Sequence, residues 1–108
     1  MFNNINYNYK PLPKNLTIKE SNIHGLGLFA VGKIPKFTNL GVSHHYIDIL
    51  IRTPLGGFVN HSENPNANIV DSLMKPSKHY LFTFHDVDDG EEILINYNLT
   101  SVAKYTVK

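Results

Sequence analysis

A dense polar turn follows directly behind an apolar segment in the second half of the chain. Residues 56–66 read GGFVNHSENPN, so Gly-Gly-Phe-Val runs without a break into an amide, an imidazole and a hydroxyl. Burial of the apolar side chains of Phe58 and Val59 brings Asn60 and His61 toward the interior, where polar groups need hydrogen-bond partners. An ordinary surface loop with Asx turns does not account for this order. The stretch instead predicts a segment that is threaded past another one, or polar atoms that hold a ligand.

Length and composition limit the kinds of protein that this chain can form. It has 108 residues, 42% hydrophobic and 18% charged, as is typical of one folded globular domain. A net charge of +1 gives no basis for a nucleic acid or membrane partner, and no stretch has the roughly 18 apolar residues of a membrane span. The absence of cysteine excludes disulfides and thiol catalysis. Since MFNNINYNYKPLPK at the start lacks the apolar run of a signal peptide, we expect a cytoplasmic or otherwise intracellular protein.

Short alternating stretches separated by turn residues run through most of the chain. They predict strands at residues 16–20, 40–43, 68–70, 80–84 and 93–97. The Asp-Asp-Gly turn at residues 88–90 favours pairing of the last two of these strands as a hairpin. Residues 46–52 fit a helical turn or a strand equally well, and residues 53–57 are typical of a loop. We therefore expect a mainly β domain with few short helices over residues 15–108, preceded by an N-terminal arm at residues 1–14.

Three local patterns fall short of the metal or nucleotide sites that they suggest. Gly25-Leu26-Gly27 lacks the third glycine, the following helix and the acidic residue of a dinucleotide fingerprint. The acidic run at residues 86–92 carries its glycine one position too early for an EF-hand loop. The histidines show neither H-x-H nor H-E-x-x-H spacing, so no metal site is predicted. What the two glycines do allow is the close approach of a ligand to bare backbone N–H and C=O groups.

Three segments in a fixed order resemble the motifs of the SET-domain protein-lysine methyltransferases. HGLGLFA at residues 24–30 is similar to the first motif of that family. The stretch at residues 56–66 is similar to its Arg-Phe-x-Asn-His-Ser-x-x-Pro-Asn motif, with Gly57 where arginine is commonest. GEEILINY at residues 90–97 is similar to its acidic Glu-Leu-x-x-x-Tyr motif. Together the segments cover roughly residues 15–100 and most resemble the small stand-alone SET proteins of viruses and bacteria.

The resemblance implies a fold, a cofactor and a set of site residues. The implied fold is a set of short curled β-sheets with a pseudoknot, where the Asn60-His61 segment and the C-terminal tyrosine motif cross. Residues 15–108 would then form a single SET domain. The implied cofactor is S-adenosyl-L-methionine, and the implied partner is a lysine-containing protein such as a histone. By motif position, the cofactor-binding residues are His24, Leu26, Gly27, Asn60, His61 and Tyr97. Tyr97 is also the expected catalytic residue, and the expected substrate channel contains Tyr46, Phe58 and Tyr105.

The reaction that the resemblance implies is in-line methyl transfer to a neutral lysine amine in a narrow channel. Only the neutral amine is nucleophilic, and neutralising a lysine with a pKa of about 10.4 at pH 7 costs about 4.6 kcal/mol. An apolar channel with a positive charge at its end lowers that pKa, so no strong base is required. Alignment of the two reactants supplies several kcal/mol more.

Departures from the family pattern leave alternatives open. Asn39-Leu40-Gly41 stands at the Tyr-x-Gly motif of the family, so one common active-site tyrosine is missing there and its replacement is open. The alternative function is therefore a SET-fold protein-binding module with weak or no catalysis, and a different metal- or sugar-binding β-domain is the third hypothesis. The insert before the Asn-His motif is only about 15 residues, and no cysteine-rich zinc segment follows the tyrosine motif. We therefore expect a homodimer in which C-terminal residues of one chain lie near the channel of the other.

Overall fold

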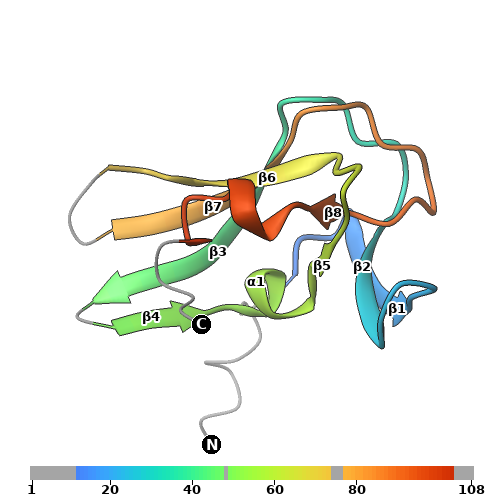
Figure 1. The fold of residues 1–108 in the computed structure, drawn as a ribbon. Helices are drawn as coiled ribbons and strands as arrows, with labels where there is room; N and C mark the ends of the chain where they lie inside the picture. The colour runs from blue at the N-terminus through green and yellow to red at the C-terminus, as the bar shows by residue number, and fades with distance from the viewer. Residues whose placement is uncertain (1–11, 48, 74–76, 104–108) are drawn as a thin grey trace, which may run out of the picture.

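The computed structural model describes residues 12–47, 49–73 and 77–103, and these residues form a mainly β fold (Figure 1). The N-terminal arm, apart from its last three residues, and Tyr105 lie outside this part of the chain. The elements in chain order are β1 (Leu16–Glu20), β2 (Leu26–Ala30), β3 (Asn39–Ile47), β4 (Ile49–Arg52), α1 (Pro54–Phe58), β5 (Asn60–His61), β6 (Ala67–Asp71), β7 (Ser77–Thr83), β8 (Leu94–Ile95) and the 3-10 helix η2 (Tyr97–Leu99). None of the helices in the described residues has the length and hydropathy needed to cross a membrane.

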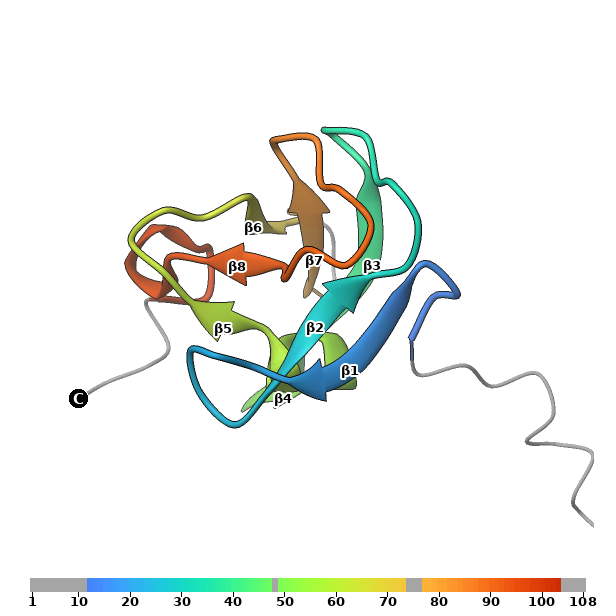
Figure 2. The ribbon, with the colours of Figure 1, turned by 90° about the vertical axis from the view of Figure 1, so that its right-hand side faces the viewer.

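The strands form three small sheets. β1 and β2 make an antiparallel hairpin, and β4, β3, β7 and β6 follow one another in a four-stranded antiparallel sheet. β5 and β8 pair in parallel although more than thirty residues of chain separate them. Figure 2 shows β5 and β8 side by side, next to β2. The expectation of a mainly β domain with few short helices is therefore confirmed.

The predicted hairpin between residues 80–84 and 93–97 is wrong. β7 pairs with β3 and β6, and β8 pairs with β5. The turn itself does form, with Gly90 at φ 85°, and the Gly90 N–H donates to the Ala30 carbonyl at 2.8 Å. Turn chemistry therefore predicted where the chain reverses, but long-range pairing decided which strands lie together.

The segment expected to be a loop at residues 53–57 is largely helical, since α1 occupies Pro54–Phe58. Proline at the first helical position suits the start of a helix, because its missing N–H has no intrahelical partner there. The Thr53 hydroxyl donates to the Val42 and Ser43 carbonyls at 2.6 and 3.1 Å, and this ties the start of α1 to β3. In the undecided stretch 46–52, residues 46 and 47 end β3, and residues 49–52 form β4, which pairs with β3.

The core lies under the place where β5, β8 and β2 meet. Its fully buried apolar side chains come from most of the elements and include Leu28, Ile34, Val59, Ile69, Leu81, Val87, Ile93 and Ile95. Burial of one such side chain contributes about 1.5–3 kcal/mol, so Ile95 of β8 and the preceding Ile93 both anchor the last strand in the core.

Candidate active site

The crossing predicted from the polar turn is present. Asn60 and His61 pair in parallel with Leu94 and Ile95, and the Ser62 N–H donates to the Ile95 carbonyl at 2.8 Å. On its other side, the same C-terminal segment contacts β2 through a bridge between Phe29 and Glu92 and through the Ile93 N–H, which donates to the Leu28 carbonyl at 2.8 Å. Residues 92–95 therefore run between β2 and β5, and both flanking motifs meet along this segment.

Asn66, the last amide of the polar turn, clamps the crossing. Its Nδ2 donates to the Glu92 carbonyl at 2.9 Å, and its Oδ1 accepts from the Leu94 N–H at 2.8 Å. The side chain is 8% exposed, so both ends of a buried amide are satisfied by the backbone of the crossing segment. No particular role for Asn66 was predicted from the sequence, because its partners lie 26 and 28 residues away.

Asn60 lies at the centre of a cluster of acceptors. Its Nδ2 is within hydrogen-bond distance of the His24 carbonyl (3.1 Å), the Leu26 carbonyl (3.2 Å) and Glu92 Oε2 (2.9 Å). An amide NH₂ carries only two hydrogens, so this cluster holds one more acceptor than Asn60 can satisfy at once. The other oxygen of Glu92 accepts from the Ser21 hydroxyl at 2.9 Å, which fixes the carboxylate. The site is therefore rich in acceptors and carries a negative charge.

Gly27 is required by this cluster for reasons of space. A Cβ at Gly27 would lie 2.9 Å from Asn60 Nδ2 and would clash with the Glu92 carboxylate. The first motif therefore needs glycine because the side chains of the other two motifs pack against its bare backbone.

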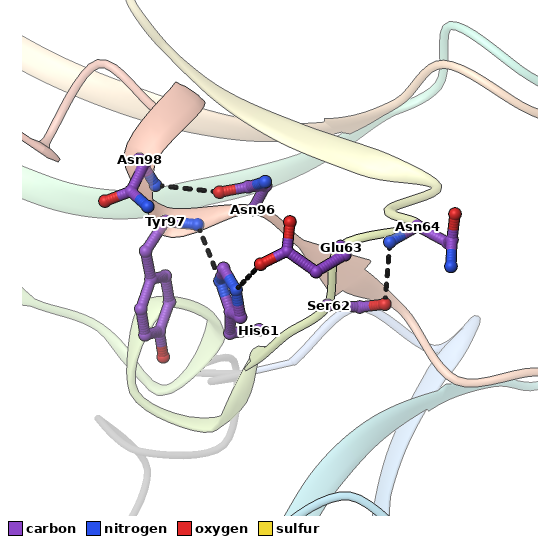
Figure 3. A network of polar contacts seen from close by, with 7 residues as sticks. All are labelled: His61, Ser62, Glu63, Asn64, Asn96, Tyr97 and Asn98. Carbon is purple, nitrogen blue, oxygen red and sulfur yellow. Dashed lines mark hydrogen bonds and ion pairs between the residues drawn. The ribbon is translucent and has the colours of Figure 1, made fainter.

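His61 positions Tyr97 (Figure 3). The Tyr97 N–H donates to His61 Nδ1 at 3.0 Å, so in the neutral imidazole Nδ1 carries the lone pair and Nε2 the hydrogen. Nε2 lies 3.4 Å from Glu63 Oε2. One residue earlier, Asn96 Oδ1 accepts from the Asn98 N–H at 3.0 Å and caps η2. These contacts hold the start of η2, and therefore the tyrosine ring, beside β5.

The Tyr97 side chain lines an apolar cavity. Its hydroxyl donates to the Val59 carbonyl at 3.1 Å, and its ring is 48% exposed. The cavity has a volume of about 130 Å³. Its lining includes His44, Gly56, Ile69, Ile95, Tyr97 and Val102. Two oxygens therefore lie together beside a narrow and mostly apolar space.

His44 is the buried titratable group of this cavity. Burial, the neighbouring His79 and the positive charge of Arg52 lower its pKa from the ordinary value of 6.5 to about 4. The side chain is 4% exposed, and its ring meets that of His79 edge to face at 6.3 Å. His44 is therefore a neutral imidazole at pH 7.

The structure brings together most, but not all, of the site residues predicted from the sequence. His24, Leu26, Gly27 and Asn60 meet at the acceptor cluster, and His61 holds Tyr97 beside them. The residues Tyr46, on β3, and Phe58, at the end of α1, are not among those lining the cavity. No site role was predicted from the sequence for Glu92, Asn66 or His44. Two of them nevertheless lie within motifs noted in the sequence: Glu92 in the acidic GEEILINY and Asn66 in the polar turn at residues 56–66.

Comparison with known proteins identifies the family. Residues 43–98, just over half of the chain, match the model of the SET domain. The chain therefore belongs to the SET domain family, and its fold is the SET-domain fold. The prediction of that family and of that fold class is confirmed.

Relatives and solved structures agree with this assignment. Two proteins named "Histone-lysine N-methyltransferase, H3 lysine-36 specific", from Cryptococcus neoformans var. neoformans serotype D strains JEC21 and B-3501A, are each 40% identical to this chain over 55 residues. That alignment covers 50% of this chain and only 7% of either relative. The crystal structure of a proposed histone methyltransferase from Plasmodium falciparum superposes with a TM-score of 0.69 at 21% identity, over 82% of this chain and 97% of that one. This second likeness concerns the fold.

Proposed function

We propose that this protein is an S-adenosyl-L-methionine-dependent protein-lysine N-methyltransferase. The observation that carries the proposal is the position of Tyr97, which lines the apolar cavity while its N–H is held by His61, the residue next to Asn60 of the acceptor cluster. We also propose that residues 15–108 form the single SET domain, preceded by an arm at residues 1–14. The short insert before the Asn-His motif supports a grouping with the small SET proteins of viruses and bacteria.

The chemistry of the acceptor cluster fits the proposed cofactor. S-adenosyl-L-methionine carries an ammonium group and a sulfonium, and cations are stabilised by carboxylate and carbonyl oxygens. The His24 and Leu26 carbonyls and Glu92 offer three acceptors against the two hydrogens of the Asn60 amide. The Leu26 side chain is 47% exposed and offers apolar surface to the rest of the molecule. When bound, this cofactor would supply an activated methyl group for transfer to an amine.

The chain's own residues would contribute alignment and electrostatics. The Tyr97 hydroxyl and the Val59 carbonyl lie 3.1 Å apart and present two oxygens toward positive charge that develops beside them. The apolar lining of the cavity disfavours a charged ammonium, and Arg52 at its edge adds repulsion of the same sign. Both effects favour the neutral, nucleophilic form of a lysine that enters the cavity.

Two measurements test the proposed function. Isothermal titration with S-adenosyl-L-methionine should show stoichiometric binding, and radiolabelled methyl transfer to a mixed histone preparation and to cell lysate should label lysine. Histones are the first choice of substrate because the relatives named above are histone-lysine methyltransferases. Absence of cofactor binding would contradict the proposal. Binding without transfer would favour the protein-binding module, which the role of Asn39 already supports: its Oδ1 accepts from the Gly41 N–H at 2.9 Å, where the register of β3 shifts.

Replacement of Asn60 by alanine is expected to weaken cofactor binding at least tenfold. Asn60 is 9% exposed, and the change removes its amide, which is the hydrogen-bond donor to three acceptors. Buried groups that are left unpaired cost about 1–3 kcal/mol. Titration calorimetry measures the affinity, and thermal melting reports the fold. Asn64→Ala, which removes an exposed amide from the same loop, is the matched control and should change neither. An unchanged affinity in folded Asn60→Ala would remove Asn60 from the site.

The protein is expected to form a homodimer. In the described part of the chain, β4 is an edge of the four-stranded sheet, and its Ile49 and Ile51 side chains are 66% and 46% exposed. Apolar edge strands pair readily with another chain, and Arg52 at the end of β4 lines the cavity. Light scattering at micromolar concentration should give the dimer mass, and Ile49→Lys should lower it toward the monomer. A fully active monomer at these concentrations would contradict the expectation.

A further inference from the structure

The cavity contains a polar group that can replace the tyrosine missing from the second motif. Asn39, at the position of that tyrosine, is 2.9 Å from the N–H of Gly41 and is absent from the cavity lining. The imidazole of His44, five residues further along β3, does line the cavity. A Cβ at Gly56 would lie 2.7 Å from His44 Cε1 and 3.1 Å from Nδ1. The Cε1–Nδ1 edge of the ring therefore faces Gly56, which is itself part of the lining.

The hydrogen-bond chain behind His44 favours one tautomer of its ring. The Ser43 hydroxyl has one hydrogen, and the His79 carbonyl at 3.1 Å is an acceptor for it. With the hydrogen on that carbonyl, Ser43 Oγ accepts the 2.9 Å bond from His44 Nδ1, and Nδ1–H is the donor. The neutral ring then carries its lone pair on Nε2, and no described residue donates to that atom.

We propose that His44 is a substrate-positioning residue whose Nε2 lone pair accepts a hydrogen bond from the amine of the target lysine. This inference rests on the proposed methyltransferase function and adds the residue that receives the amine. The amine donates an N–H to Nε2, which leaves its own lone pair directed toward the Tyr97 side of the cavity.

The surroundings of His44 keep its ring neutral, so that Nε2 stays a hydrogen-bond acceptor. The titratable or charged groups that face it are His79 on β7, Arg52 on β4 and Tyr97 on η2. With its pKa lowered to about 4, His44 stays neutral above pH 5. A protonated imidazole has no lone pair and would repel an ammonium, so the neutral form is the one that the role requires.

A single acceptor at this position also sets the number of methyl groups that can be added efficiently. In each transfer the amine nitrogen would form a bond to the methyl carbon as the sulfonium C–S bond breaks, and the methylated amine would then lose one proton to water. Each transfer therefore leaves one N–H fewer, and a dimethylated amine has no hydrogen left for Nε2. Orientation by His44 therefore supports the first two transfers and not the third. The expected products of the wild-type protein are monomethyl- and dimethyl-lysine.

The test compares three variants of the full chain with mixed histones as the probe substrate. His44→Phe removes the acceptor and keeps a flat ring, and His44→Gln restores an acceptor oxygen. His45→Phe is the matched control, because His45 is the next residue of β3 and lines a different surface pocket. Loss of one hydrogen bond should raise the apparent KM for histone about three- to tenfold in His44→Phe, with the affinity for S-adenosyl-L-methionine within twofold of wild type. Mass spectrometry should show a larger share of trimethyl-lysine in His44→Phe, and His44→Gln and His45→Phe should resemble wild type.

Nitrogen-resolved NMR of the wild-type protein measures the tautomer of His44 without a substitution that could disturb folding. It should show His44 as the Nδ1–H tautomer, and a hydrogen on Nε2 would overturn the inference. A folded His44→Phe variant with the KM and the product ratio of wild type would also overturn the inference. If the wild-type protein still transferred methyl groups, the proposed function would stand. A wild-type protein that neither binds the cofactor nor labels histone would overturn the proposed function and this inference with it.

Discussion

Tyr97→Phe is expected to slow methyl transfer by on the order of a hundredfold or more, the usual effect of losing one aimed group at a transition state. Cofactor affinity should stay within a few-fold of wild type, because the ring, its 5.4 Å centroid contact with His61 and the bond from the Tyr97 N–H to His61 all remain. The ring is 48% exposed and the lost hydroxyl bond to Val59 is a single one, so the fold should lose only about 1 kcal/mol. A tyrosine with a purely structural role would give the opposite pattern.

Paired measurements separate the two patterns. Titration calorimetry gives the affinity for S-adenosyl-L-methionine, and radiolabelled transfer at saturating cofactor gives the turnover. Tyr80→Phe removes the same atom from a half-buried tyrosine on β7, beside a shallow pocket that shares no residue with the cavity, and it should leave both quantities unchanged. If Tyr97→Phe turns over as fast as wild type, the hydroxyl has no part in transfer. Tyr46 and Tyr105 then become the candidates.

Local patterns predicted the strands of this fold far better than their pairing. The alternation at Leu16–Glu20 is β1, and the stretches at 68–70 and 80–84 fall within or overlap β6 and β7. The pairing failed at residues 93–97, where a turn of good hairpin chemistry leads into a strand that pairs with Asn60 and His61 instead. Burial of Ile93 and Ile95 in the core and the clamp by Asn66 outweigh the local turn preference. Neither can be read from a window of neighbouring residues.

The residues of the candidate site also divide into those that sequence motifs predicted and those that only the fold identifies. Asn60 stood out because a dense polar turn directly behind an apolar segment is unusual, and Tyr97 stood out because GEEILINY resembles the tyrosine motif of the SET-domain family. Glu92 and His44 did not, because their importance comes from partners on other elements: Glu92 meets Asn60 across 32 residues, and His44 meets the far end of β4 and α1 in the cavity. The sequence alone does not show whether a histidine within a strand is exposed or buried, because this depends on how the strands pack. The neutrality of His44 is a property of that burial.

Acid is expected to destabilise the protein through His44, by up to about 3 kcal/mol, or more than a hundredfold in the unfolding equilibrium. The pKa of His44 is about 4 in the folded protein and 6.5 when the ring is unperturbed. Between these two values the unfolded chain binds a proton that the folded chain does not, so the free energy of unfolding falls as the pH drops from 6.5 to 4. Above pH 6.5 both states hold a neutral imidazole, and His44 adds no pH dependence. Below pH 4 both are protonated, and the loss is complete.

Denaturant titrations at half-unit steps from pH 7 to pH 4 measure this slope, and comparison with His44→Gln isolates the contribution of one residue. Glutamine does not titrate, so the variant should lose less stability than wild type over this window, by up to about 3 kcal/mol at pH 4. The groups other than His44 are common to both proteins, so the difference between the two curves reports His44. Parallel curves for wild type and His44→Gln would show that His44 titrates normally. The cavity would then contain a cation near pH 6, where a neutral acceptor for a lysine amine is required.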